Sequence, residues 1–109
     1  MDAEDKKLFV LAKATRVRAD AAEGAALRDL DGRTYAGATV DLPHLQVSAV
    51  GVVISMAVAS GSRGAEAVVV LTKGDISGSD LDALRDFAGA DVPVHRGSWS
   101  GTVEDVTTT

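Results

Sequence analysis

The sequence contains no cysteine, and it has no surplus of positive charge. Without cysteine there can be no disulfide framework, no thiol nucleophile and no metal site built from thiolates. Eleven lysines and arginines stand against sixteen aspartates and glutamates, which gives a formal net charge of -5. A protein of this charge repels phosphate backbones. We therefore expect no nucleic acid among its partners.

The sequence also lacks an apolar run of the roughly 20 residues that a membrane-spanning helix needs. Its longest apolar segment, 46-QVSAVGVVISMAVASG-61, is interrupted by Gly51 and Ser55. The first residues, MDAEDKKLF, are acidic and do not show the basic start and apolar run of a secretion signal. We expect a cytoplasmic protein that does not contact a membrane.

What is present is the composition of an ordinary globular domain. Apolar residues make up 46% of the chain and charged residues 25%, which is close to the average for soluble domains. A chain of 109 residues has room for one hydrophobic core. We expect residues 1–109 to form a single domain.

The spacing of apolar residues predicts a helix near the start of the chain. Leu8, Leu11, Ala12 and Thr15 lie on one face of such a helix. Acidic residues precede this set and basic residues follow it, an order that favours the helix dipole. The basic residues, at positions 13, 16 and 18, are interpreted as a solvated helix end and not as a phosphate site.

The middle of the chain predicts a hairpin, a helix and a strand. Residues 25–40, AALRDLDGRTYAGATV, suit a β-hairpin whose tight turn is made by Asp31 and Gly32. The apolar run over 48–60 is too long for a normal strand, so it predicts a helix that is buried on all sides. Residues 65–71, AEAVVVL, predict a central strand that is covered on both faces.

The remainder of the chain predicts a helix and two strands. Ser79, with Asp82 three residues later, resembles a capping box and predicts a helix that begins near residue 79. Residues 91–96, DVPVHR, predict a short strand in which Pro93 favours an edge or irregular position. Residues 102–106 predict a last strand.

The expected element order is therefore α-β-β-α-β-α-β-β. Helices that alternate with strands after residue 45 indicate a sheet with a parallel part and helices on both faces. The predicted fold class is α/β, a three-layer α/β/α sandwich with a mixed sheet.

Three segments, 24-GAALRDLDGRTYAGATVD-41, 48-SAVGVVISMAVASG-61 and 77-SGSDLDALRDFA-88, resemble the cytidine deaminase family. The first is similar to the family's hairpin, the second to its Cys-Ala-Glu-Arg helix, and the third to its Cys-x-x-Cys-Arg-Gln helix. The resemblance covers nearly the whole chain and implies a cytidine deaminase-like fold.

In that family, three protein ligands hold one zinc ion and a glutamate transfers protons. The resemblance places the first ligand at Ser48, the glutamate at Val50, and the paired cysteines at Ser77 and Asp80. Serine hydroxyls are poor zinc ligands, and valine cannot carry a proton. We therefore expect no zinc cofactor and no catalytic residue at these positions. The interpretation is a catalytically inactive member that works as a binding or assembly module.

Two alternatives stay open, a nucleoside or nucleotide sensor and a divergent deaminase whose metal is held by Asp80 and a histidine. For a sensor, the resemblance implies ribose contacts at Thr39 and Asp41, which keep some hydrogen-bonding capacity. Three serines near predicted helix starts are candidate ligand contacts, and N-caps are the preferred interpretation; they are Ser48, Ser77 and Ser79.

Three further side chains and one segment complete the expectations. His44 and His95 match no metal-ligand spacing and are interpreted as ordinary surface or core histidines. Trp99, in 97-GSWSG-101, is interpreted as a cover for the edge of the core. The apolar segment 48–60 has more surface than one small sheet covers, and the resemblance implies that such helices pack across subunit contacts. We expect a homo-oligomer, either a dimer or a tetramer.

Overall fold

The computed structural model describes residues 2–98, 100 and 102–109, so the interpretation of Trp99 falls outside the described residues. The elements follow one another in the order α1 (Ala3–Ala19), β1 (Gly24–Asp29), β2 (Thr34–Ala38), β3 (Val40–Leu42), β4 (Leu45–Val47), α2 (Ala49–Ala59), β5 (Ala65–Leu71), α3 (Gly78–Ala88), β6 (Pro93–Gly97) and β7 (Val103–Thr108). No described helix combines the length and the apolar character that crossing a membrane requires.

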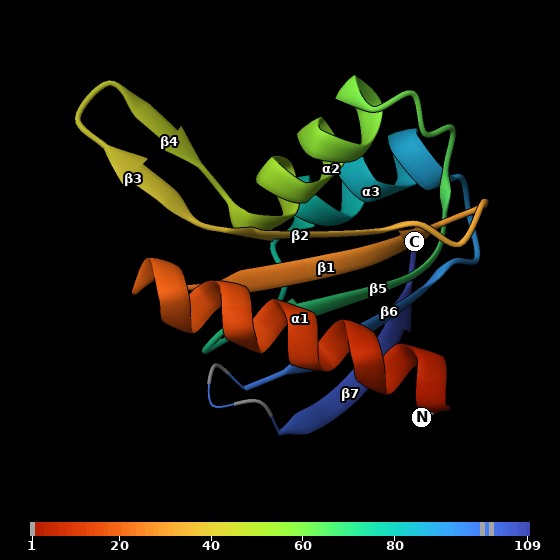
Figure 1. Cartoon of the computed structure of the whole chain (residues 1–109), viewed down its shortest axis with the longest axis horizontal. Coiled ribbons are helices and arrows are strands. Elements are labelled where there is room, and N and C mark those ends of the chain that lie inside the picture. The colour runs from red at the N-terminus through yellow and green to blue at the C-terminus, as the bar shows by residue number, and fades with distance from the viewer. Residues whose placement is uncertain (1, 99, 101) are drawn as a thin grey trace.

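Five strands form one mixed sheet in the order β2-β1-β5-β6-β7. Strands β5 and β6 run parallel, and the other neighbours run antiparallel. Helix α1 packs on one face of this sheet, while α2 and α3 lie side by side on the other (Figure 1). The predicted three-layer α/β/α sandwich is confirmed.

Local chemistry explains the two predicted elements at the start of the chain. Helix α1 begins at its N-cap Asp2, whose carboxylate accepts a hydrogen bond from a backbone N–H of the first turn, and it buries Leu8 and Ala12 against the sheet. The β1–β2 hairpin turns at the predicted pair, where Gly32 has a φ of 84°. Glycine adopts this left-handed conformation without strain, so the sequence signal was sufficient here.

The sheet separates two apolar clusters, which explains why β5 shows no alternation of polar and apolar residues. Val68 and Val70 pack into the cluster under α2 and α3, while Val69 and Leu71 pack into the cluster under α1. Both faces of β5 are therefore buried, as the sequence predicted. Gly37 of β2 allows α2 to approach closely, because an added Cβ would lie 2.8 Å from a valine side chain of that helix.

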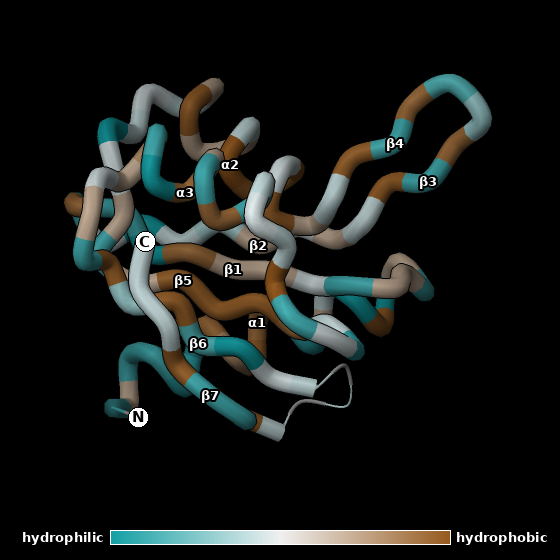
Figure 2. The backbone as a smooth tube through the Cα atoms, turned by 180° about the vertical axis from the view of Figure 1, so that it is seen from behind, coloured by the Kyte–Doolittle hydropathy of each residue, from teal (hydrophilic) through white to brown (hydrophobic). Residues whose placement is uncertain are grey.

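The prediction missed the hairpin formed by β3 and β4. These three-residue strands pair Val40 with Val47 and turn at Pro43 and His44. They form a separate two-stranded sheet that projects away from the body as an arm (Figure 2). The strands are too short to produce a recognisable period in the sequence.

The structure also corrects three details. Helix α2 is not buried on all sides, because the sheet and α3 cover only part of it and leave Met56 41% and Val58 57% exposed. Helix α3 begins at Gly78, one residue before the predicted start, and its N-cap is Ser77 in place of Ser79. Strand β6 lies between β5 and β7 and not at an edge; Pro93 is its first residue, a position that proline tolerates.

Candidate functional site

The N-termini of α2 and α3 meet at a hydrogen bond between two side chains. The Ser48 hydroxyl donates to Oδ1 of Asp80 at 2.7 Å. The same hydroxyl accepts a hydrogen bond from the Gly51 N–H at 3.0 Å, which makes Ser48 the N-cap of α2. One serine therefore closes its own helix and ties it to α3.

Ser77 has the equivalent position on α3. Its hydroxyl accepts a hydrogen bond from the Asp80 N–H at 3.1 Å, and it lies 3.2 Å from the hydroxyl of Ser79. Asp80 thus bonds to Ser77 through its backbone and to Ser48 through its side chain. The structure therefore brings together three of the four positions to which the resemblance assigned catalytic chemistry.

The fourth position, Val50, lies in the hydrophobic core. It is 1% exposed and belongs to the apolar cluster between the sheet and the helices α2 and α3, together with Val53 and Leu84. An aliphatic side chain in this environment packs against its neighbours and exchanges no proton. The position at which the resemblance expects the proton-transferring glutamate is therefore part of the core.

The charge of Asp80 matches the electrostatics of the junction. A helix N-terminus carries a partial positive charge on its free N–H groups, and a nearby carboxylate stabilises it. Asp80 lies in the first turn of α3 and contacts the N-cap of α2. The Asp80 carboxylate therefore lies next to the N-termini of both helices. Its charge reduces their attraction for an anion from solution.

This set of donors does not fit a zinc ion. Zinc sites in proteins are built from cysteine, histidine and carboxylate ligands, usually three or four of them. Of Ser48, Ser77 and Asp80, only the aspartate belongs to those types, and its Oδ1 already accepts a hydrogen bond. Within the described part of the chain, no group of three or more His, Cys, Asp or Glu side chains is arranged to hold a metal ion.

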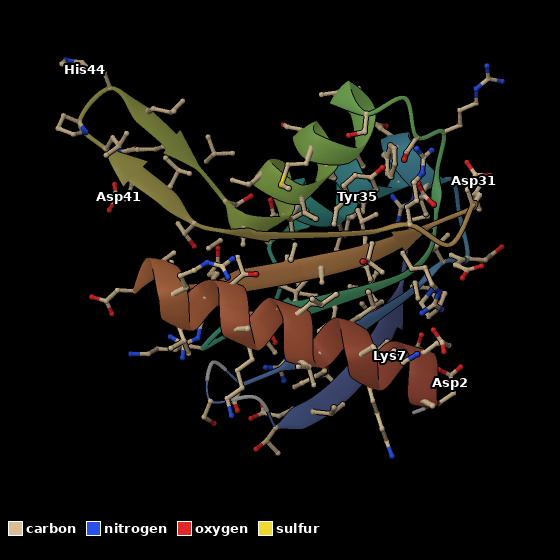
Figure 3. All side chains as sticks on the ribbon, viewed as in Figure 1. Asp2, Lys7, Asp31, Tyr35, Asp41 and His44 are labelled. Atoms are coloured by element: carbon tan, nitrogen blue, oxygen red, sulfur yellow. The ribbon has the colours of Figure 1, made fainter. Side chains whose placement is uncertain are left out.

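The two candidate ribose contacts lie at a different place. The Thr39 hydroxyl accepts a hydrogen bond from the Glu23 N–H at 3.0 Å and so joins the end of β2 to the loop before β1. Asp41 is exposed on the arm (Figure 3). Both line a hollow of about 470 Å³ formed by residues 19–22 and 39–42. The lining of this hollow does not include the junction serines or Asp80.

The histidines do not join Asp80 either. His44 is exposed at the turn of the arm. His95 is buried on the α1 side of the sheet, where its Nε2 atom lies 3.1 Å from Oδ2 of Asp5. Asp80 is on the opposite side of the sheet, in α3. The metal pair that a divergent deaminase would need is therefore not assembled.

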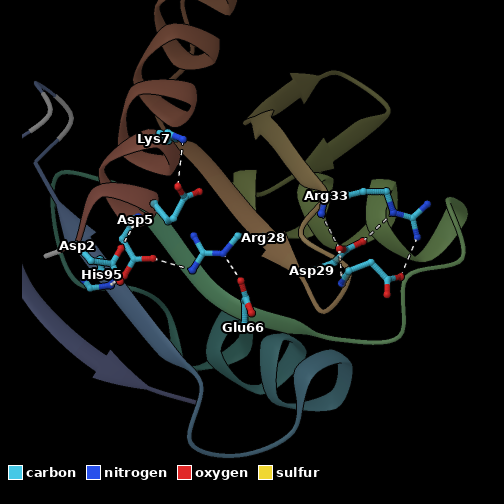
Figure 4. Close-up of polar contacts among 10 residues, drawn as sticks. Asp2, Asp5, Lys7, Arg28, Asp29, Arg33, Glu66 and His95 are labelled. Carbon is cyan, nitrogen blue, oxygen red and sulfur yellow. Dashed lines mark hydrogen bonds and ion pairs between the residues drawn. The ribbon is translucent and has the colours of Figure 1, made fainter.

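Asp5 is also part of a charge network that the sequence did not reveal. Its Oδ1 atom pairs with the Arg28 guanidinium at 2.9 Å, and Arg28 also pairs with Glu66 (Figure 4). Burial opposes the charge on Arg28, but the hydrogen bonds to Glu66 and Asp5 outweigh it and raise the pKa of Arg28 above its usual value. In the sequence, the acidic start of α1 is explained by the helix dipole alone, so no signal points to these partners.

A second unpredicted feature is the buried carboxylate of Asp29, at the end of β1. Ser62 donates a hydrogen bond to it at 2.5 Å, and the Tyr35 hydroxyl lies 3.0 Å from the Ser62 hydroxyl. The backbone N–H groups of Asp31 and Arg33 donate to its other oxygen (Figure 4). The hydrogen bond from Ser62 lowers the pKa of Asp29, despite the opposing effect of burial. This network stabilises the hairpin turn and is remote from the junction.

Comparison with known proteins identifies the family. Residues 1–101 match the family model described as cytidine deaminase-like. Similar solved structures include the cytidine deaminases from Burkholderia pseudomallei (26% identity, TM-score 0.81, covering 99% of this chain and 93% of that one), Mycobacterium leprae (22%, 0.76, 98% and 94%) and Bacillus anthracis (14%, 0.71, 98% and 84%). A search of curated protein sequences gives no match. The match over residues 1–101, which the sequence resemblance anticipated, shows that the chain belongs to the cytidine deaminase-like family.

Proposed function

We propose that this cytidine deaminase-like chain does not catalyse zinc-dependent deamination and acts instead as a binding or assembly module. The observation that carries the proposal is the 2.7 Å hydrogen bond between Ser48 and Asp80. It joins two of the positions at which the resemblance expects zinc ligands. A direct contact between these side chains takes the place of contacts to a shared ion.

The chemistry of deamination supports the same proposal. The family reaction needs a water made nucleophilic by a metal ion and a carboxylate that transfers protons. The junction offers two hydroxyls that cap helices and one carboxylate that accepts a hydrogen bond from one of them. The core valine at position 50 supplies no proton carrier. A cytoplasmic location and the absence of a nucleic acid partner remain part of this proposal.

For the assembly role, the partner that we propose is a second copy of the chain, in a dimer or tetramer. The uncovered side of α2 exposes Met56 and Val58, and the arm beside it exposes Leu42 (56%) and Leu45 (53%). Monomeric proteins rarely leave large contiguous apolar surfaces in water. Packing this surface against its counterpart would bury side chains that the single chain leaves exposed.

The test combines an activity assay with a mass measurement. Purified protein should convert cytidine to uridine no faster than a blank, and light scattering at micromolar concentration should give a multiple of the chain mass. Leu45→Glu should lower that mass, while Val106→Glu, an equally exposed apolar position on β7 (55%), should not. Turnover that follows the protein through purification would contradict the inactive role, and a monomer mass for the unchanged protein would contradict the assembly role.

A nucleoside sensor is the second candidate, because Thr39 and Asp41 line a hollow of about 470 Å³. A ligand that binds only the folded state raises the melting temperature. Under this candidate, a nucleoside should raise the melting temperature of the protein and should have a smaller effect on Asp41→Ala. An unchanged melting temperature at millimolar nucleoside would dismiss it.

A further inference from the structure

The outer face of α1 carries an apolar stripe that no part of the described chain covers. Val10 is 68% exposed and Val17 is 58% exposed, and Ala14 is exposed between them. The side chains that core packing requires lie on the opposite side of the helix. The stripe is therefore not needed for folding of the chain.

The stripe forms a hole of the kind that accepts a side chain in knobs-into-holes packing. Positions 10, 13, 14 and 17 are spaced as i, i+3, i+4 and i+7, the four residues that surround a hole when one helix packs on another. A shallow hollow of about 590 Å³ lies over these residues and Arg18. The small side chain of Ala14 leaves room at the centre of the hole. This geometry favours an apolar side chain that enters from a partner helix.

The margin of the stripe is basic although the chain as a whole is acidic. Among the described residues, Lys7 pairs with Glu4 at 3.1 Å, whereas Lys6, Lys13 and Arg18 form no ion pair. Cations at the edge of an apolar strip attract a partner whose carboxylates flank its own apolar residues. A second α1 would bring like charges together, so self-pairing of this helix is disfavoured.

We propose that the outer face of α1 binds an amphipathic helix of another protein, with apolar residues at heptad spacing and aspartates or glutamates beside them. An apolar side chain of that helix enters the hole over Ala14, and its carboxylates pair with Lys13 and Arg18. This surface is separated by the sheet from the α2 surface assigned to self-assembly (Figure 1). The two proposals are therefore independent.

A helix partner explains the surface better than a lipid membrane does. Helices that lie in a membrane surface usually insert tryptophan, phenylalanine or leucine side chains, whereas this stripe consists of two valines and an alanine. Side chains of this size give little apolar area for insertion. They do allow close approach of two helix backbones.

The probe for the test is a synthetic helical peptide of about three heptads, with leucine at the two core positions and glutamate at the flanking positions. We expect the peptide to bind the whole chain and to shift amide resonances of α1, with an affinity that falls as salt is added. Lys13→Glu should weaken binding about tenfold, and Ala14→Gln should weaken it by filling the hole. Arg63→Glu, which reverses an exposed cation elsewhere, should leave it unchanged.

Circular dichroism of each variant establishes that the fold is intact. The proposal is overturned by an absence of peptide binding, by resonance shifts confined to α2 or the arm, or by equal binding of a peptide with lysine in place of glutamate. Binding to phosphatidylserine vesicles that Lys13→Glu abolishes would replace it with a membrane surface. A change in the mass of the protein itself on Lys13→Glu would replace it with a contact between copies.

Discussion

Val50→Glu places a carboxyl group at the position where the resemblance expects the family's proton carrier. In this chain the position is a core site, 1% exposed and surrounded by the apolar cluster under α2. Among the described residues, no group of side chains that could hold a zinc ion lies beside the new carboxyl group. We therefore expect a loss of stability with no gain of deaminase activity.

Three effects contribute to the expected loss. Removing the buried valine side chain costs about 1.5–3 kcal/mol of hydrophobic stabilisation. Fitting the longer glutamate side chain into a packed core costs about 1–3 kcal/mol. An unpaired buried polar group adds about 1–3 kcal/mol. The sum, about 3.5–9 kcal/mol, is comparable with the whole free energy of unfolding of a domain of this size, about 5–15 kcal/mol.

The loss should increase as the pH rises. Burial favours the neutral carboxyl and raises its pKa in the folded state above the unfolded value of about 4.3. The folded state then binds more protons than the unfolded state, so the free energy of unfolding falls with pH by up to about 1.4 kcal/mol per unit above that value. Ser55→Glu puts the same group on the exposed side of α2 and should show no such dependence.

Urea unfolding of the wild-type protein and both variants between pH 5 and pH 9, at one protein concentration, measures these differences. The midpoint for Val50→Glu should be the lowest at every pH and should decrease further toward pH 9. A midpoint equal to that of the wild-type protein across this range would refute the reasoning, because it would mean that residue 50 faces a solvated pocket.

Two other side chains give sharp expectations. Ser48→Ala removes the N-cap of α2 and the hydrogen bond to Asp80. The free energy of unfolding in urea should therefore fall by about 0.5–2 kcal/mol. An unchanged urea midpoint would show that the junction has no structural role. Asp29 has a pKa below its usual 3.8 because of its hydrogen bond from a serine, so it stabilises the fold above that pH and loses this effect as the pH falls through its folded-state pKa. Asp29→Asn should therefore be less stable than the wild-type protein at pH 7, with a difference that shrinks toward pH 2; a constant difference would contradict this linkage.

The sequence predicted the layers of the fold because local signals and the core agree. The turn pair before Arg33, the strand over 65–71 that is apolar except for Glu66, and the apolar face of α1 each indicate one structure only, and the structure contains all three. The arm was missed because two strands of three residues have no measurable period. The sequence predicts burial of α2 on all sides, but the single chain leaves Met56 and Val58 exposed, because an apolar pattern cannot say whether the cover comes from the same chain.

At the candidate site, the sequence singles out residues but not the bonds between them. Ser48 and Asp80 were singled out separately, yet their hydrogen bond joins residues 32 positions apart. The pair formed by Asp5 and His95 spans 90 positions. Neither separation leaves a local pattern, because the first contact depends on how the fold brings α2 and α3 together and the second on how α1 packs against β6.

The metal content of the purified protein tests the central claim most directly. The protein would be produced in medium supplemented with zinc and purified without chelators, and zinc per chain would be measured by inductively coupled plasma mass spectrometry. The hydrogen bond between Ser48 and Asp80 and the lack of a fitting ligand set among the residues that the structure describes lead us to expect less than about 0.1 zinc per chain after dialysis. A ratio near one that survives dialysis would contradict the account.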